Sequence, residues 1–172
     1  MKQLLSIDTN AKTVKGQKQG YMTGILYLAP YNLSGYQVCP MAEKAKCIDG
    51  CLNKAGRGAF NSVQQARINK TKYFFENRQQ FMLDLAASIE ALIRKAGREN
   101  FIPVVRLNGT SDIKWENILF DYTFAHGKQR EVTIFELFPE LQFYDYTKTP
   151  NRKSLPDNYD LTFSYSGAST FA

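Results

Sequence analysis

Residues 101–112 read FIPVVRLNGTSD, and this stretch decides the fold that we expect for the chain. An apolar run with adjacent valines over 101–107 is typical of a buried β-strand, and the Asn, Gly, Thr, Ser and Asp that follow are turn formers. The next segment, 115–124, is compatible with a helix. Strand, polar turn and helix in this order predict one βα unit.

The same order of strand and polar turn recurs along the chain. Apolar runs at 24–28, 141–146 and 160–165 are each followed by polar residues, and a weaker run lies at 132–137. Parallel strands need crossover connections, so this alternation predicts an α/β fold with a mainly parallel sheet. We expect the three clear runs and 102–107 to lie in one sheet.

A long helical stretch separates the first two of these strands. It runs from about 62 to 96 and has a candidate break at 76–78, and Gly97 is a plausible stop. Apolar residues recur on one helical face within it, which predicts core packing rather than cofactor binding: Phe81, Leu85, Ile89 and Leu92.

Length and composition favour one globular domain. The chain has 172 residues, of which 44% are hydrophobic, enough for a proper core. We expect residues 1–20 to be a flexible polar arm with at most one short edge strand, and 21–172 to be a single α/β domain. The strands are too few for a closed barrel. We therefore expect an exposed sheet edge that a partner, a second copy or a further segment would cover.

The charge pattern limits the partners only weakly. The formal net charge is +6, but Lys and Arg are dispersed and form no block of like charges. This excess fits an anionic partner, nucleic acid among them. The sequence has no apolar stretch near the roughly 20 residues of a membrane helix and no secretory signal, so we expect a cytoplasmic protein without a membrane partner.

The three cysteines of the chain lie within thirteen residues, in the run CPMAEKAKCIDGC of residues 39–51. An odd, clustered set argues against a secreted disulfide framework. Cys39, Cys47 and Cys51 instead predict a metal centre with one coordination position left open, because three thiolates do not saturate it. The alternative is that one or two of the thiols only pack. A short helix could occupy 42–53.

Polar residues that follow the predicted strands are expected to meet this cysteine loop. Parallel strands send their carboxyl ends to one face, and ligand sites gather there. The candidate catalytic residues are Asp112, Lys148 and Arg106. The candidate cofactor-binding residues are Asn108, Thr110, Ser164 and Ser166. Ser111 and Asp112 would equally suit a helix N-cap.

Three motifs in order resemble the phage gene-product-88 domain, a largely uncharacterised family of phages and prophages. They are CPMAEKAKCIDGCLNKAGRG, VVRLNGTSDIKWE and FYDYTK, and the resemblance covers about 24–172. It implies a phage-type protein of the host cytoplasm. Members of the family usually continue further, so the chain is either a naturally short member or a truncated one.

The family is in turn similar to compact radical-SAM enzymes, whose partial (β/α) barrel carries a three-Cys loop after the first strand. This likeness implies a [4Fe–4S] cluster on Cys39, Cys47 and Cys51, with redox or radical chemistry on a small or anionic substrate. Radical-SAM proteins have the spacing C-x3-C-x2-C, whereas this chain has C-x7-C-x3-C and no Gly-Gly-Glu run after the second strand. These differences in spacing and motif weaken the expectation of SAM binding more than the expectation of cluster binding.

The sequence is also compatible with two other functions. One is a structural zinc module in which His126, the only histidine, joins the three cysteines. The other is nucleic-acid binding through basic and aromatic residues around one helix. Those residues are Arg57, Arg67, Lys70, Lys72, Tyr73 and Phe74.

Overall fold

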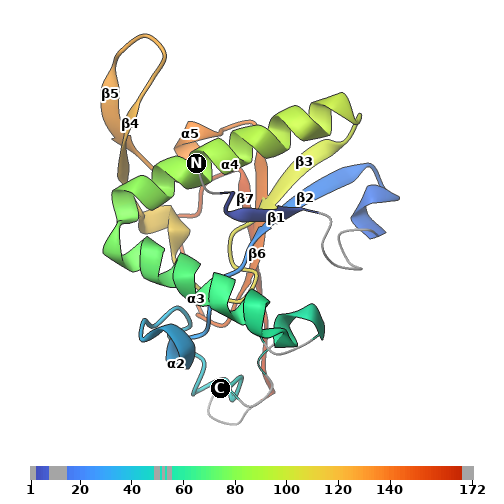
Figure 1. The fold of residues 1–172 in the computed structure, drawn as a ribbon, viewed down its shortest axis with the longest axis vertical. Helices are drawn as coiled ribbons and strands as arrows, with labels where there is room; N and C mark the ends of the chain where they lie inside the picture. The colour runs from blue at the N-terminus through green and yellow to red at the C-terminus, as the bar shows by residue number, and fades with distance from the viewer. Residues whose placement is uncertain (1–2, 8–14, 49–50, 52, 54–55, 168–172) are drawn as a thin grey trace.

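The computed structural model describes residues 3–7, 15–48, 51, 53 and 56–167, and its centre is a five-stranded open sheet (Figure 1). The strand order is β1-β2-β3-β6-β7. β1 is antiparallel to β2, and every other neighbouring pair is parallel. The predicted mainly parallel sheet is therefore confirmed. The strands are β1 (Leu5–Ile7), β2 (Tyr21–Leu26), β3 (Ile102–Arg106), β6 (Gln142–Thr147) and β7 (Tyr159–Phe163).

Two long helices connect β2 to β3, as the sequence predicted. They are α3 (Asn61–Glu76) and α4 (Arg78–Arg98), and the predicted break falls at Asn77. Gly97 does not stop α4, so that prediction was wrong. The helix ends where Asn100 adopts a positive φ of 57° and the amide of Phe101 donates to the carbonyl of Ala96. The short elements are α2 (Tyr31–Ser34), η2 (Gly56–Ala59), η3 (Trp115–Asn117) and α5 (Ile134–Leu137).

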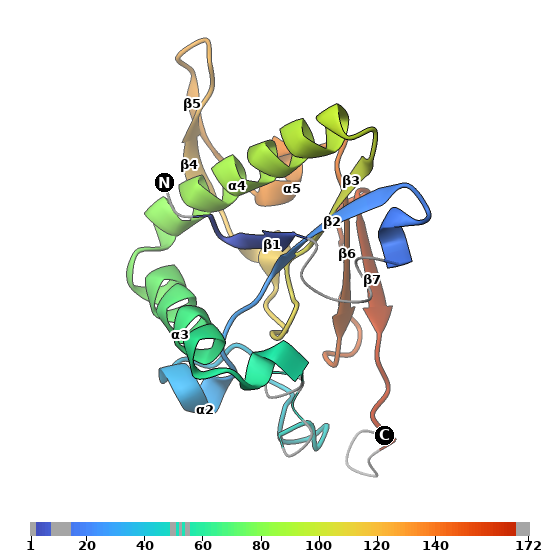
Figure 2. The same ribbon diagram turned by 45° about the vertical axis from the view of Figure 1, so that its right-hand side comes forward.

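The core lies between α4 and the sheet. Figure 2 shows α3 and α4 on the same side of the sheet, and α4 packs against β1, β2 and β3. The predicted apolar stripe is fully buried: Phe81, Leu85, Ile89 and Leu92 are each 0% exposed. Gly24 allows the close approach, since a Cβ there would lie 2.8 Å from Cδ2 of Leu92. Within the first 20 residues, Leu4 and Leu5 also enter this core.

The segment 115–124 is not a helix, contrary to expectation. After η3 it forms β4 (Phe120–Thr123), which pairs with β5 (Gln129–Val132) in a separate two-stranded antiparallel sheet. Aromatic residues at 120, 122 and 124 follow the period of two of a strand and contact one another edge to edge. Gly127, with φ of 82°, makes the hairpin turn.

The strand predicted at 132–137 is also wrong, because β5 ends at Val132 and the rest of the run forms α5. Thr133 and Glu136 form a reciprocal capping box that starts α5, with the Thr133 amide donating to Glu136 Oε2 at 2.7 Å. This local hydrogen bonding outweighs the β-branched character of the run.

The helix expected in 42–53 is absent from its described part. Residues 40–46 form turns, because Lys46 adopts a positive φ of 49° and the Cys47 amide donates to the carbonyl of Ala42. Positions 49, 50 and 52 of this segment lie outside the described residues. None of the helices in the described part of the chain is long and apolar enough to span a bilayer.

Candidate ligand pocket at the carboxyl edge of the sheet

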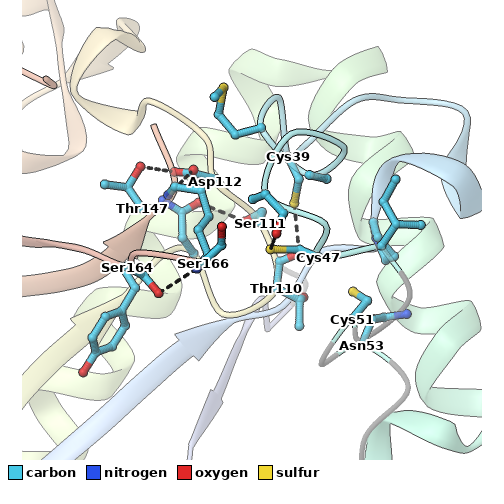
Figure 3. A pocket seen from close by; sticks show the side chains of 18 of the residues that line it. Cys39, Cys47, Cys51, Asn53, Thr110, Ser111, Asp112, Thr147, Ser164 and Ser166 are labelled. Carbon is cyan, nitrogen blue, oxygen red and sulfur yellow. Dashed lines mark hydrogen bonds between the residues drawn. The ribbon is translucent and has the colours of Figure 1, made fainter. Parts of the chain in front are cut away.

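A pocket of about 480 Å³ lies where the parallel strands end (Figure 3). Its walls come from the cysteine segment, the turn after β3, and the residues that follow β6 and β7. The structure therefore brings all the predicted site residues to one cavity. They are Cys39, Cys47, Cys51, Arg106, Asn108, Thr110, Asp112, Lys148, Ser164 and Ser166.

The three cysteines line this pocket as free thiols. The Cys39 Sγ lies 3.7 Å from the carbonyl oxygen of Thr110, and the Cys47 Sγ lies 3.5 Å from that of Ala45. Burial, then the charges of Asp112 and the other two thiols, raise the pKa of Cys39 to about 12. Among the described residues, no group of three or more His, Cys, Asp or Glu side chains is already arranged to hold a metal ion.

A backbone contact fixes the start of the cysteine segment against the turn after β3. Val38 is fully buried, and its carbonyl accepts a 2.7 Å hydrogen bond from the amide of Asp112. The amide of Cys39 is satisfied by the side chain of Gln37. Cys39 is thereby held at the pocket wall by elements that are 71 residues apart in sequence.

The turn after β3 is built around the side chain of Asn108. Its Oδ1 accepts from the Ser111 hydroxyl, the Ile113 amide and the Trp115 indole, at 2.9, 3.0 and 3.0 Å. Thr110 donates to the carbonyl of Leu28 at 2.5 Å. Asn108 and Thr110 were predicted to bind a cofactor; in this structure the Asn108 side chain holds the turn together, and Thr110 ties the turn to Leu28, just after β2.

Glycine at position 109 is a steric requirement of this turn. A Cβ there would lie 2.7 Å from the carbonyl oxygen of Leu26 and 2.7 Å from Cγ2 of Ile25. The amide of Gly109 donates to that same carbonyl at 3.0 Å. The turn thus rests directly on the β2 backbone, which a side chain would prevent.

Asp112 joins the β3 turn to the segment after β6. Its carboxylate accepts from the Thr147 hydroxyl at 2.7 Å and from the Lys148 amide at 2.8 Å, and forms a 3.3 Å ion pair with Arg152. Arg152 also pairs with Glu116. All three charged side chains are at most 8% exposed. Its oxygens are engaged by these partners, so Asp112 anchors the pocket wall in this structure, and its catalytic role stays a prediction.

Cationic side chains form the remaining wall of the pocket. Arg106 lies with its guanidinium carbon 5.1 Å from the ring centroid of Tyr146. The Lys148 Nζ donates to the Ser164 hydroxyl at 3.0 Å, so Lys148 connects β6 to the residue after β7. Ser166 lines the pocket beside them.

Asp145 is an important residue that the sequence did not single out. Its side chain is fully buried beneath the pocket and accepts from the amides of Leu107 and Asn108 and from the Tyr159 hydroxyl. Burial raises the pKa of Asp145 to about 7, against the lowering effects of these donors and of Arg106. The signal was present in the sequence, since a lone carboxylate interrupts the aromatic strand FYDYT.

Of the two alternative sites, the zinc set does not assemble among the described residues, and the nucleic-acid set has two buried members. His126 lies in the exposed β4–β5 turn, stacks on Phe124 with centroids 5.8 Å apart and is not a pocket residue. Figure 1 shows this hairpin and α2 at opposite ends of the molecule. Of the basic and aromatic set on α3, Arg67 is buried against Asn53 and Phe74 is in the core. The side chain of Arg57 lies outside the described residues.

Comparison with known proteins identifies the chain by family. A search of curated proteins found no match, and a search of solved structures found none either. A family model described as gene product 88 matches residues 3–171, which is nearly the whole chain. The chain therefore belongs to the gene product 88 family.

Proposed function

We propose that this protein binds a [4Fe–4S] cluster through Cys39, Cys47 and Cys51 and uses it on a small molecule in the adjacent pocket. The observation that carries the proposal is the position of the thiols: all three face one cavity at the carboxyl edge of a parallel sheet. Thiolates are the usual ligands of iron–sulfur clusters, and three of them leave one iron without a protein thiolate. When bound, such a cluster supplies redox or Lewis-acid chemistry at that iron.

Three cysteine thiols are the right type of ligand for the cluster, but their positions would have to shift for all three to bind it. The thiols share the pocket but do not yet surround a common point among the described residues. Cys39 and Cys47 make sulfur hydrogen bonds of 3.7 and 3.5 Å to carbonyl oxygens, which are weak interactions to exchange for metal–thiolate bonds. Cys39 is fixed by its neighbours on both sides, so binding would bring Cys47 and Cys51 toward it.

The protonation of Cys39 gives the proposal a pH dependence. Its thiol is protonated at neutral pH because burial and nearby negative groups raise its pKa to about 12. Metal ligands must be deprotonated, so loading would release this proton and become more favourable as pH rises.

The chain's own residues would define the space around the cluster. The Asp112 amide ties the β3 turn to Val38 at the start of the cysteine segment, Asn108 holds the turn in shape, and Arg106 and Lys148 also line the pocket. In this proposal the open sheet is the partial (β/α) barrel that the sequence suggested. SAM as the ligand of the open iron stays a secondary proposal, because the cysteine spacing departs from the radical-SAM pattern.

Anaerobic reconstitution tests the proposal against the zinc alternative. The protein would be loaded with ferrous iron and sulfide, and separately with zinc, and compared with the H126Q variant. We expect a broad absorption band near ~400 nm and about four irons and four sulfides per chain, in wild type and H126Q alike. Stoichiometric zinc binding that is lost in H126Q, together with no stable iron or sulfide, would overturn the proposal.

A further inference from the structure

We propose that Arg106 and Lys148 form an anion-binding subsite on the wall of this pocket, and that the ligand of the pocket carries a carboxylate or phosphate group. The inference deepens the proposed function and rests on it, because it names the class of small molecule that would lie beside the cluster.

The two cations lie on the same side of neighbouring strands. Arg106 ends β3, and Lys148 follows the last residue of β6. Tyr146 precedes Lys148 by two positions, and side chains two positions apart share a face of a strand. The Arg106 guanidinium lies over the ring of Tyr146 at 5.1 Å, and all three residues line the pocket.

Arg106 has hydrogen-bonding capacity that the described residues leave unused. A guanidinium carries five N–H donors in a fixed fork. Nη2 makes one long hydrogen bond, 3.3 Å, to the carbonyl oxygen of Asn108. Nε is buried and has no hydrogen-bond partner among the described residues; the nearest carboxylate oxygen, on Asp145, is 3.6 Å away. The buried Nε faces Asp145, whereas the remaining Nη donors are available to a carboxylate or phosphate in the pocket.

Lys148 offers a second set of donors at the same wall. Its ammonium has three N–H bonds, and the structure shows one hydrogen bond from it, to the Ser164 hydroxyl at 3.0 Å. No acidic side chain forms an ion pair with Lys148 within the described part of the chain. Its charge therefore faces the pocket without a carboxylate partner.

The acidic residue that lines the pocket does not neutralise this wall. Asp112 is already engaged by Arg152 and by hydrogen bonds from Thr147 and Lys148. Asp145 is fully buried, forms a 3.6 Å ion pair with Arg106 Nε, and accepts hydrogen bonds from two amides and from Tyr159. Asp145 therefore offsets part of the Arg106 charge, whereas Lys148 has no acidic ion-pair partner among the described residues. A cavity of about 480 Å³ has room for a small molecule that reaches from this wall to the thiols.

Isothermal titration with inorganic phosphate, and separately with malonate, tests the subsite at constant ionic strength. The metal-free protein and the iron-loaded protein are both titrated. We expect saturable binding of at least one anion, and the tighter of the two identifies the ligand class. R106Q and K148Q should each weaken binding about tenfold, the effect of one charged hydrogen-bonding partner. R94Q is the matched control, because Arg94 is a 61% exposed surface residue on α4, and its affinity should stay within about twofold.

The outcomes separate this inference from the proposed function. No saturable binding of either anion to either form would overturn the subsite. Equal losses in R94Q, or unchanged affinity in both R106Q and K148Q, would also overturn it. Anion binding by a protein that cannot be loaded with iron would support the subsite and contradict the cluster. Iron-loaded protein that binds neither anion would support the cluster and contradict the subsite.

Discussion

Replacing Asp112 with alanine is expected to destabilise the fold strongly, because its carboxylate joins three segments. It accepts from the Thr147 hydroxyl and the Lys148 amide and pairs with Arg152, whose side chain is 3% exposed. In the D112A variant the Arg152 guanidinium keeps its pairing with Glu116 but loses its second carboxylate. The Lys148 amide also loses its acceptor.

The size of the effect follows from the burial of these groups. Removing one partner of a buried ion pair costs about 3–5 kcal/mol when the remaining charge is left uncompensated. Because Glu116 still pairs with Arg152, we expect the lower end of this range, about 3 kcal/mol, which for a chain of this length is a fall in Tm of roughly 6–12 °C. D112N keeps the size of the side chain and part of the hydrogen bonding, so we expect a smaller loss.

Urea unfolding followed by the fluorescence of Trp115 measures this prediction. Trp115 is fully buried and is hydrogen-bonded within the same turn, so its emission reports on this region. D160N is the matched control, because Asp160 is exposed on β7, and its unfolding free energy should change by less than about 0.5 kcal/mol. A loss below about 1 kcal/mol in D112A would refute the reasoning that Asp112 anchors the pocket wall.

Two further predictions concern residues that the fold constrains. The folded-state pKa of Asp145 is raised to about 7, so its contribution to stability is present at low pH and is lost as pH rises toward and through 7. D145N mimics the protonated acid beside Arg106 and Tyr159. The unfolding free energy of D145N minus that of wild type should rise by roughly 2–4 kcal/mol between pH 4 and pH 8. A difference that stays constant with pH would contradict this. The G109A variant should have an unfolding free energy about 1–3 kcal/mol below that of wild type, because its methyl group meets the Leu26 carbonyl. G97A has open space around it in α4, so its unfolding free energy should be about 0.5–1 kcal/mol above that of wild type. Equal effects of the two substitutions in urea unfolding would argue against the described turn.

The sheet could be predicted because its signals are local and repeated. Apolar runs rich in β-branched or aromatic residues identified β2, β3, β6 and β7, and the helical segments between β2 and β3 required a parallel connection. Parallel strands then placed the cysteines, Asp112 and Lys148 at one edge, where the structure has its pocket. Their metal-binding and catalytic roles stay predictions.

The elements that were predicted wrongly lie where two local sequence signals compete. At 115–124 the alternation of aromatic residues favoured a hairpin over a helix, and at 133–136 a capping box outweighed β-branched residues. The partners of Asp112 could not be predicted from spacing either, since Arg152 lies 40 positions away and meets it only when β3 and β6 pair.

The iron and sulfide content of three single variants tests the central claim most directly. C39S, C47S and C51S would be reconstituted anaerobically beside wild type, with urea unfolding to show that each variant is folded. Each replacement removes one thiolate of three, so we expect every variant to retain less than about half of the iron and sulfide of wild type and to lose the band near ~400 nm. Iron content near that of wild type in all three folded variants would contradict the account.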